Sequence, residues 1–153
     1  MDFELFNEIT AEYKHKKPIL FALEHDKIIS AEEAGRFEQT IQLELPPKFK
    51  QFLLEYGGGY FGYANVYSLD KDGFFYLLKY NDPPIDRYLR IADNGCGDSY
   101  LLSIDNQKCL DRVLFYDHET KNVCETEYAD ILEYLIAAGL KAGVEKTASG
   151  LQS

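Results

Sequence analysis

A turn crowded with glycine and aspartate leads directly into an alternating segment, and this junction constrains the fold more than any other stretch. The turn contains Asp93, Asn94, Gly95 and Gly97, and the alternating segment follows at residues 99–105. Glycine adopts the positive φ angles that strain other residues, and Asp and Asn side chains hydrogen-bond their own backbone. The sequence therefore predicts a tight turn followed by a strand.

Apolar residues at helical spacing predict three helices before this turn. The first covers about residues 2–16, because Pro18 ends the pattern. Ser30 and Glu33 have the form of a capping box, so a second helix follows them. The third starts near Pro47, which suits a first helical turn, and ends at Gly57.

The remaining chain reads mainly as strands. Residues 60–69 are rich in Tyr and end at a turn over 70–73, whereas the apolar run 74–80 suits either a buried strand or a short helix. A last helix is expected over about 127–140, and residues 141–153 are expected to fray. The other predicted strands are 88–92, 99–104, 113–116 and 123–125, the last of these reached through a hairpin over 118–122.

Helices precede and follow the block of strands instead of alternating with it, which predicts an α+β fold. We expect a mainly antiparallel sheet flanked by helices. With 153 residues, the chain fits a single domain over 1–153.

Charge and composition narrow the classes of partner. The net charge is −10, and residues 93–130 hold nine acidic against three basic side chains. Because phosphate backbones are bound by Lys and Arg, direct nucleic-acid binding is disfavoured and a basic partner is favoured. The start of the chain lacks the pattern of a signal peptide, and no apolar run reaches the ~20 residues of a membrane span. A cytoplasmic protein without membrane contact is the expectation.

No motif in the chain predicts catalysis, a cofactor or a metal. Gly57, Gly59 and Gly62 match G-x-G-x-x-G, but a helix precedes them and a strand follows, the reverse of a dinucleotide site. The three cysteines lack metal-ligand or paired spacing, so reduced thiols are expected. Asp117 and His118 could join Cys96 in a Cys-His-Asp site, yet nothing supplies a pocket or an oxyanion hole. We therefore expect a protein that is not an enzyme.

Three segments together resemble the SUKH superfamily, of the Smi and Knr type, and more closely its bacterial YobK-like members. They are the helix 46–56 that runs into Gly57-Gly58-Gly59, the turn with Gly95 and Gly97, and residues 113–118. The resemblance is strongest over 30–140. It implies an α+β fold, glycines that fix the turns, and a role as an immunity protein that neutralises a secreted polymorphic toxin.

Under that resemblance, acidic and aromatic side chains are the candidates for contact with the toxin. Tyr60 and Tyr63 would be aromatic anchors, although strand alternation must bury one side of their segment and core packing is an equal alternative. Asp93 and Asp98 flank the same turn, so one of them could cap the turn while the other faces solvent. The acidic candidates are Asp93, Asp98, Asp105, Asp117 and Glu119.

The expected partner is a basic nuclease domain, with ribonucleases favoured, because such toxins must attract a polyanion. Stoichiometric occlusion of the toxin is the expected mechanism. Two alternatives remain open: an intracellular regulatory or scaffolding module, and an enzyme that uses Asp117 and His118.

Overall fold

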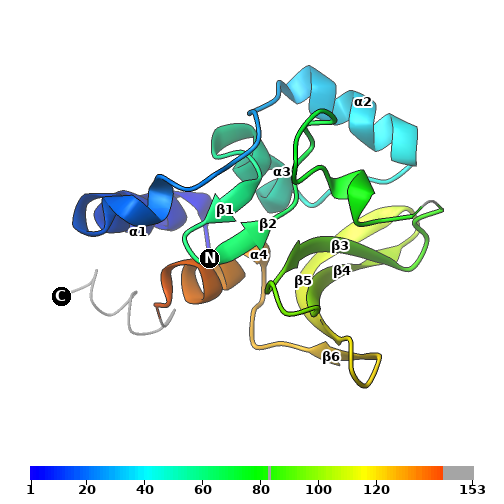
Figure 1. Ribbon diagram of the computed structural model, residues 1–153. Coiled ribbons are helices and arrows are strands. Elements are labelled where there is room, and N and C mark those ends of the chain that lie inside the picture. Colours follow the sequence, from blue (N-terminus) through cyan, green and yellow to red (C-terminus); the bar gives the residue numbers. More distant parts are fainter. Residues whose placement is uncertain (83, 143–153) are drawn as a thin grey trace.

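The computed structural model describes residues 1–82 and 84–142 and confirms the α+β fold (Figure 1). The helices are α1 (Phe3–Lys16), α2 (Ala31–Ile41), α3 (Pro47–Glu55) and α4 (Ile131–Tyr134), which continues as the π-helical segment η3 (Leu135–Gly139). Two short 3₁₀ helices are η1 (Pro18–Phe21) and η2 (Leu77–Lys79). The strands are β1 (Gly59–Phe61), β2 (Ala64–Val66), β3 (Tyr88–Asp93), β4 (Ser99–Asp105), β5 (Lys108–Asp117) and β6 (Asn122–Glu125).

The six strands form one sheet in the order β1-β2-β3-β4-β5-β6, and each neighbouring pair is antiparallel. This is a meander, in which every strand pairs with the next one along the chain. Figure 1 shows the β1–β2 hairpin beside α1, α3 and α4, with α2 at the periphery. Consecutive pairing brings alternate turns to the same end of the sheet, so the β3–β4 and β5–β6 turns lie at one end.

The predicted starts of the first two helices are confirmed by side-chain caps, from Asp2 for α1 and from Ser30 for α2, and α3 begins at Pro47 as predicted. The Ser30 hydroxyl accepts from the Glu33 amide at 3.1 Å, as the capping box predicts. The last helix, however, begins at Ile131 and not near residue 127. The Asp130 side chain accepts from the Glu133 amide at 2.9 Å and caps the helix there. Fraying was expected over 141–153, and residues 143–153 of this range lie outside the described part of the chain.

The predicted single strand over 60–69 is wrong, because the segment folds back as the β1–β2 hairpin. Gly62 takes φ +59° at the turn, and a side chain there would overlap the carbonyl oxygen of Gly139. A glycine in a strand-like run thus marks a tight turn that packs against the end of η3. The ambiguous run 74–80 contains the 3₁₀ helix η2.

The core lies between one face of the sheet and the helices. Phe61 stacks with Phe6 at a centroid distance of 5.5 Å and meets Phe52 edge-on at 5.4 Å. Tyr100 of β4 contacts Tyr134 of α4 at 4.4 Å. These aromatic contacts fix the inner face, so the alternate residues of each strand point away from the core. In the described part of the chain, no helix has both the length and the apolar character needed to cross a membrane.

Candidate functional site

One row of side chains crosses all six strands on the face opposite the core, which we call the outer face. The pairing register places these residues side by side, from β1 to β6. In this row the outer face carries two tyrosines and one acidic side chain, and Ser99 within the row is buried. The row consists of Tyr60, Asn65, Asp93, Ser99, Tyr116 and Val123.

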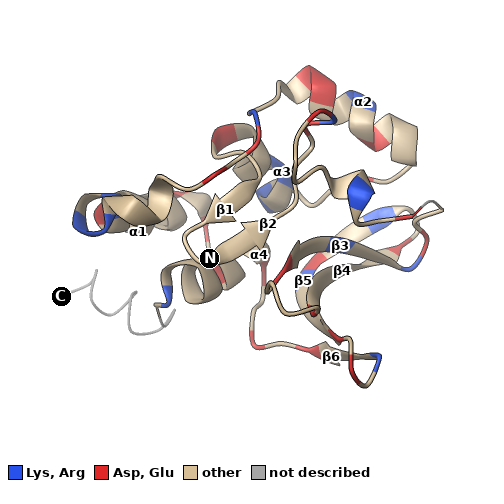
Figure 2. Cartoon of the chain, in the orientation of Figure 1, with Lys and Arg blue, Asp and Glu red and all other residues tan. Residues whose placement is uncertain are grey.

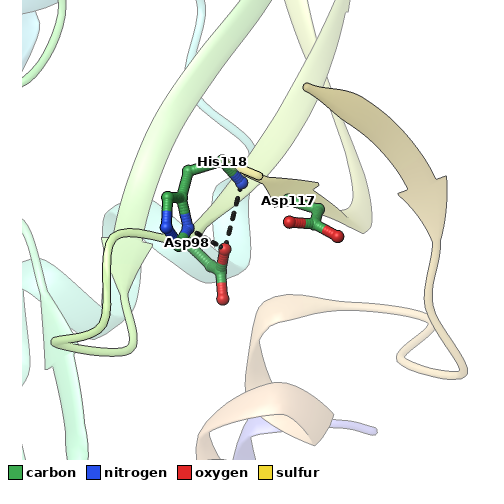
Figure 3. Close-up of side chains that lie close together, drawn as sticks. All are labelled: Asp98, Asp117 and His118. Atoms are coloured by element: carbon green, nitrogen blue, oxygen red, sulfur yellow. Dashed lines mark hydrogen bonds and ion pairs between the residues drawn. The ribbon is translucent and has the colours of Figure 1, made fainter. Parts of the chain in front are cut away.

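Two acidic turns meet at one end of this sheet, because the β3–β4 and β5–β6 connections lie on the same side of the meander. Figure 2 shows acidic residues around these turns. Asp98 joins the turns: one carboxylate oxygen accepts from the His118 amide at 3.0 Å and is 2.7 Å from His118 Nδ1 (Figure 3). The other oxygen accepts from the Asn94 side chain at 3.0 Å. We call this region, residues 93–98 and 117–119, the acidic end.

The hydrogen bonds shift both pKa values of the Asp98–His118 pair. Donation from the His118 side chain and then from its backbone lowers the pKa of Asp98 to about 2. The hydrogen bond to Asp98 in turn raises the pKa of His118 above its ordinary value. The pair is solvent-exposed at the histidine, whose side chain is 45% accessible. The carboxylate therefore remains charged and the imidazolium is favoured.

Asp93 is used inside the fold. Its carboxylate accepts from the Tyr67 hydroxyl at 2.7 Å, from the Asn65 side chain at 3.1 Å and from the Gly95 amide at 2.9 Å. Burial of the Tyr67 hydroxyl, together with this hydrogen bond, raises the pKa of Tyr67. Asp93 thus caps its own turn and anchors the start of the acidic end.

The other acidic candidates divide between the two ends of the sheet. Asp117 caps the β5–β6 turn by accepting from the Glu119 amide at 2.9 Å, and the Glu119 side chain is exposed. Asp105 lies opposite Lys108 in the strand register of the β4–β5 hairpin, at the other end of the sheet. The structure therefore brings together four of the five acidic candidates and separates Asp105 from them.

Both tyrosine candidates are exposed. Tyr60 is 43% accessible and Tyr63 is 60% accessible, whereas Phe61 between them is buried in the core. The Tyr60 ring lies 5.4 Å from that of Phe75, and the neighbouring Phe74 is 70% accessible. The alternative for this segment, burial in the core, applies to Phe61 but not to Tyr60 or Tyr63.

Sequence reasoning missed Phe74 and the residue that places it. Asp26 is buried, and its carboxylate accepts from the amides of Phe74 and Phe75 at 3.0 and 2.8 Å and from the Ser68 hydroxyl at 2.5 Å. These bonds hold the 73–75 loop against the β1 edge. Asp26 stands in a polar loop and pairs with residues more than forty positions away, so no local pattern marks it.

The carboxylate that orients His118 is Asp98 and not Asp117, which corrects the pair considered for catalysis. Ligand atoms of Asp98, Asp117 and His118 lie within 4.8 Å of one another. A metal bound through Nδ1 would have to displace the hydrogen bond that joins the two turns. The arrangement is explained by turn linkage, and neither catalysis nor metal binding is needed to account for it.

The structure is that of an α+β domain, in which helices pack against one face of a six-stranded antiparallel sheet. A family described as SMI1-KNR4 cell-wall, within the SUKH superfamily, matches residues 31–135, so the chain belongs to this family. The match supports the superfamily resemblance seen in the sequence, while the closer likeness to YobK-like members stays a prediction. No curated protein and no solved structure matches the chain significantly.

Proposed function

We propose that this protein is an immunity protein, which binds a cognate secreted toxin and blocks it by stoichiometric occlusion. Membership of the SMI1-KNR4 family is consistent with that role. The observation that carries the proposal is the acidic end, where Asp98, Asp117 and Glu119 are held on two linked turns beside an aromatic outer face.

A nuclease, with a ribonuclease favoured, is the toxin class that this surface fits best. A nuclease presents a basic cleft to its polyanionic substrate, and the acidic end could occupy that cleft. The net charge of −10 adds long-range attraction toward such a partner. Because the nucleic-acid targets of such toxins lie inside cells, the proposal places the inhibitor in the cytoplasm.

The proposed mechanism is binding without turnover. His118 is committed to Asp98 through both its ring and its amide. Cys96, the thiol considered with His118, is exposed on the β3–β4 turn, while burial raises the pKa of the Cys109 thiol to about 12, which keeps Cys109 protonated and a poor nucleophile. Exposed tyrosines supply contact area at a low entropic cost, as in other binding surfaces.

Co-expression with a candidate toxin, such as a nuclease-like domain found in a neighbouring reading frame, tests the proposal. We expect growth to be restored, and the purified proteins to form a one-to-one complex in which RNA cleavage stops. Titration calorimetry and an RNA cleavage assay measure stoichiometry and inhibition on the same samples. Protection without a complex, or protection at catalytic amounts, would contradict occlusion.

His118→Ala separates the binding mechanism from the enzymatic alternative. The folded variant is expected to bind and protect, because His118 links turns and does not react with the toxin. A variant that still binds the toxin but no longer protects would instead support catalysis. A solitary gene without a toxin-like neighbour, together with binding to an endogenous protein, would favour the regulatory module.

A further inference from the structure

A pocket of opposite charge lies on the same outer face as the acidic end. Its volume is about 790 Å³, within the ~300–1,000 Å³ typical of ligand pockets. The strands β3, β4 and β5 form its floor through Arg90, Leu101 and Tyr116. Arg87 and Lys121 stand at its rim, the latter on the β5–β6 turn.

A buried asparagine builds one wall of this pocket. The Asn81 side chain donates to the Leu77 carbonyl at 3.0 Å and to the Arg90 carbonyl at 2.9 Å, and it accepts from the Arg90 amide at 2.8 Å. Strand β2 is short and pairs with β3 only at Ala92 and Asp93. At Arg90, the Asn81 side chain makes the backbone hydrogen bonds that a longer neighbouring strand would make. The adjoining Tyr80 stacks on Tyr67 with a centroid distance of 4.0 Å. The wall is therefore held in place by specific contacts.

Two of the three cations of the pocket, Arg87 and Arg90, lie against tyrosine rings. The Arg90 guanidinium lies 5.1 Å from the Tyr116 ring, and that of Arg87 lies 5.5 Å from the Tyr88 ring. Among residues 1–82 and 84–142, no carboxylate forms an ion pair with Arg87, Arg90 or Lys121.

The other two arginines are placed differently. Arg36 and Arg112 lie 3.9 and 3.6 Å from glutamate carboxylates. A guanidinium stacked on a ring keeps the N–H groups at its edge free to bind a planar anion. In a chain of net charge −10, two such arginines in one pocket are suited to an incoming anion.

We propose that this pocket receives a carboxylate side chain from an acidic loop of the partner protein. A carboxylate matches the fork of a guanidinium in a bidentate geometry, and the tyrosines contact the stem of the incoming residue. Asp82 and Asp86 also line the pocket and repel ligands of high negative charge, which disfavours polyphosphates and nucleic acid.

This inference rests on the proposed role in binding a toxin, and it adds a device for specificity. A partner would need a basic patch for the acidic end and, at a set distance, an acidic side chain for the pocket. Two opposite charges on one face fix the orientation of docking, because a rotated partner meets like charges.

A peptide titration tests the pocket without any toxin. The probe is an acetylated and amidated peptide of sequence Gly-Glu-Tyr-Glu-Gly, added to ¹⁵N-labelled protein and followed by NMR. Millimolar binding is expected for such a small contact, with saturable shifts of the Arg87, Arg90 and Lys121 amides. The matched peptide with Gln in place of both Glu residues should bind about tenfold more weakly, because it lacks the charge.

Arg90→Gln is expected to weaken binding of the Glu peptide about tenfold, whereas Arg112→Gln removes the same charge outside the pocket and should leave it unchanged. Equal binding of the two peptides, or equal loss in both variants, would overturn the proposal. So would saturable shifts of these amides with adenosine monophosphate but not with the Glu peptide. Because these measurements involve no toxin, their failure would leave the immunity role itself untouched.

Discussion

Single side chains join the two turns of the acidic end, and Asp98 makes the contacts that span them. It accepts from the amide and the ring of His118, and this raises the pKa of His118 while lowering its own to about 2. The Asp98 contribution to stability is present above its unfolded pKa of about 4 and is lost as pH falls toward 2. The His118 contribution is present below about pH 6.5 and is lost as pH rises through its folded pKa.

Asp98→Asn is expected to lower the pKa of His118 toward its ordinary value, because the variant keeps an oxygen acceptor but loses the charge. NMR titration of the imidazole resonances measures this shift, and His15, an exposed histidine on α1, serves as the internal control. An unchanged His118 titration in the folded variant would show that Asp98 does not stabilise the imidazolium.

Asp111 predicts a second residue-scale effect, with the opposite sign. Burial, followed by repulsion from Asp130, raises its pKa to about 6. Its contribution to stability is therefore present below about pH 4 and lost as pH rises through 6. Asp111→Asn should increase the free energy of unfolding at pH 7.5 by roughly 1 to 3 kcal/mol.

The gain from Asp111→Asn should disappear near pH 4, where the wild-type carboxyl is protonated. Urea denaturation at the two pH values measures the difference. Equal stabilisation of the variant at both pH values would show that the effect comes from packing and not from ionisation of Asp111. Asp105→Asn, an exposed carboxylate in the nearby hairpin, is the control and is expected to change stability little.

At the scale of elements, the β3–β4 turn offers two glycines that share one backbone requirement and differ in their surroundings. Gly95 and Gly97 have φ of +75° and +99°. A Cβ at Gly97 would lie 3.0 Å from His118 Nδ1, whereas a Cβ at Gly95 meets nothing within 4 Å. Gly95→Ala should therefore cost about 1 to 2 kcal/mol for the left-handed backbone alone.

Gly97→Ala should cost more than Gly95→Ala, because it also disturbs the contact with the β5–β6 turn. Thermal denaturation of both variants, with the His118 titration as a second readout, measures the difference. Equal destabilisation with an unchanged His118 pKa would show that the two turns do not depend on close approach at Gly97.

The elements that were predicted are those whose signals are local. The Ser30 cap, the Pro47 start and the 93–98 turn each depend on residues within a few positions, and the structure has all three. The late start of α4 depends on the Asp130 cap, which is also a local signal, three residues before Glu133, and was overlooked. The β1–β2 hairpin depends on Gly62 fitting against Gly139, a contact between segments far apart in the chain. Single-sequence patterns do not show such contacts.

The same limit applies to the site at the scale of the whole molecule. The acidic excess could be predicted, because composition is visible in the sequence, whereas exposure of Tyr60 and Tyr63 was one of two equal alternatives that only the structure decides. The separation of Asp105 from the other acids follows from the meander, in which alternate turns lie at opposite ends. The basic pocket was missed because Arg87, Arg90 and Lys121 are few against the acidic background and meet only through the sheet.

The charge of the whole molecule leads to the last prediction, which concerns the rate of association with the toxin. Glu119→Lys reverses an exposed charge at the acidic end and should slow association about three- to tenfold, because facing charges steer encounter. Glu8→Lys makes the same change on α1, which lies away from the acidic end in Figure 1, and should have a smaller effect.

Stopped-flow measurements of the association rate across salt concentrations provide the test, since the screening length shortens from ~10 Å at 0.1 M to ~3 Å at 1 M. Wild type and Glu119→Lys should converge at high salt. A salt-independent wild-type rate, or equal slowing by both variants, would remove the acidic end from the mechanism of association.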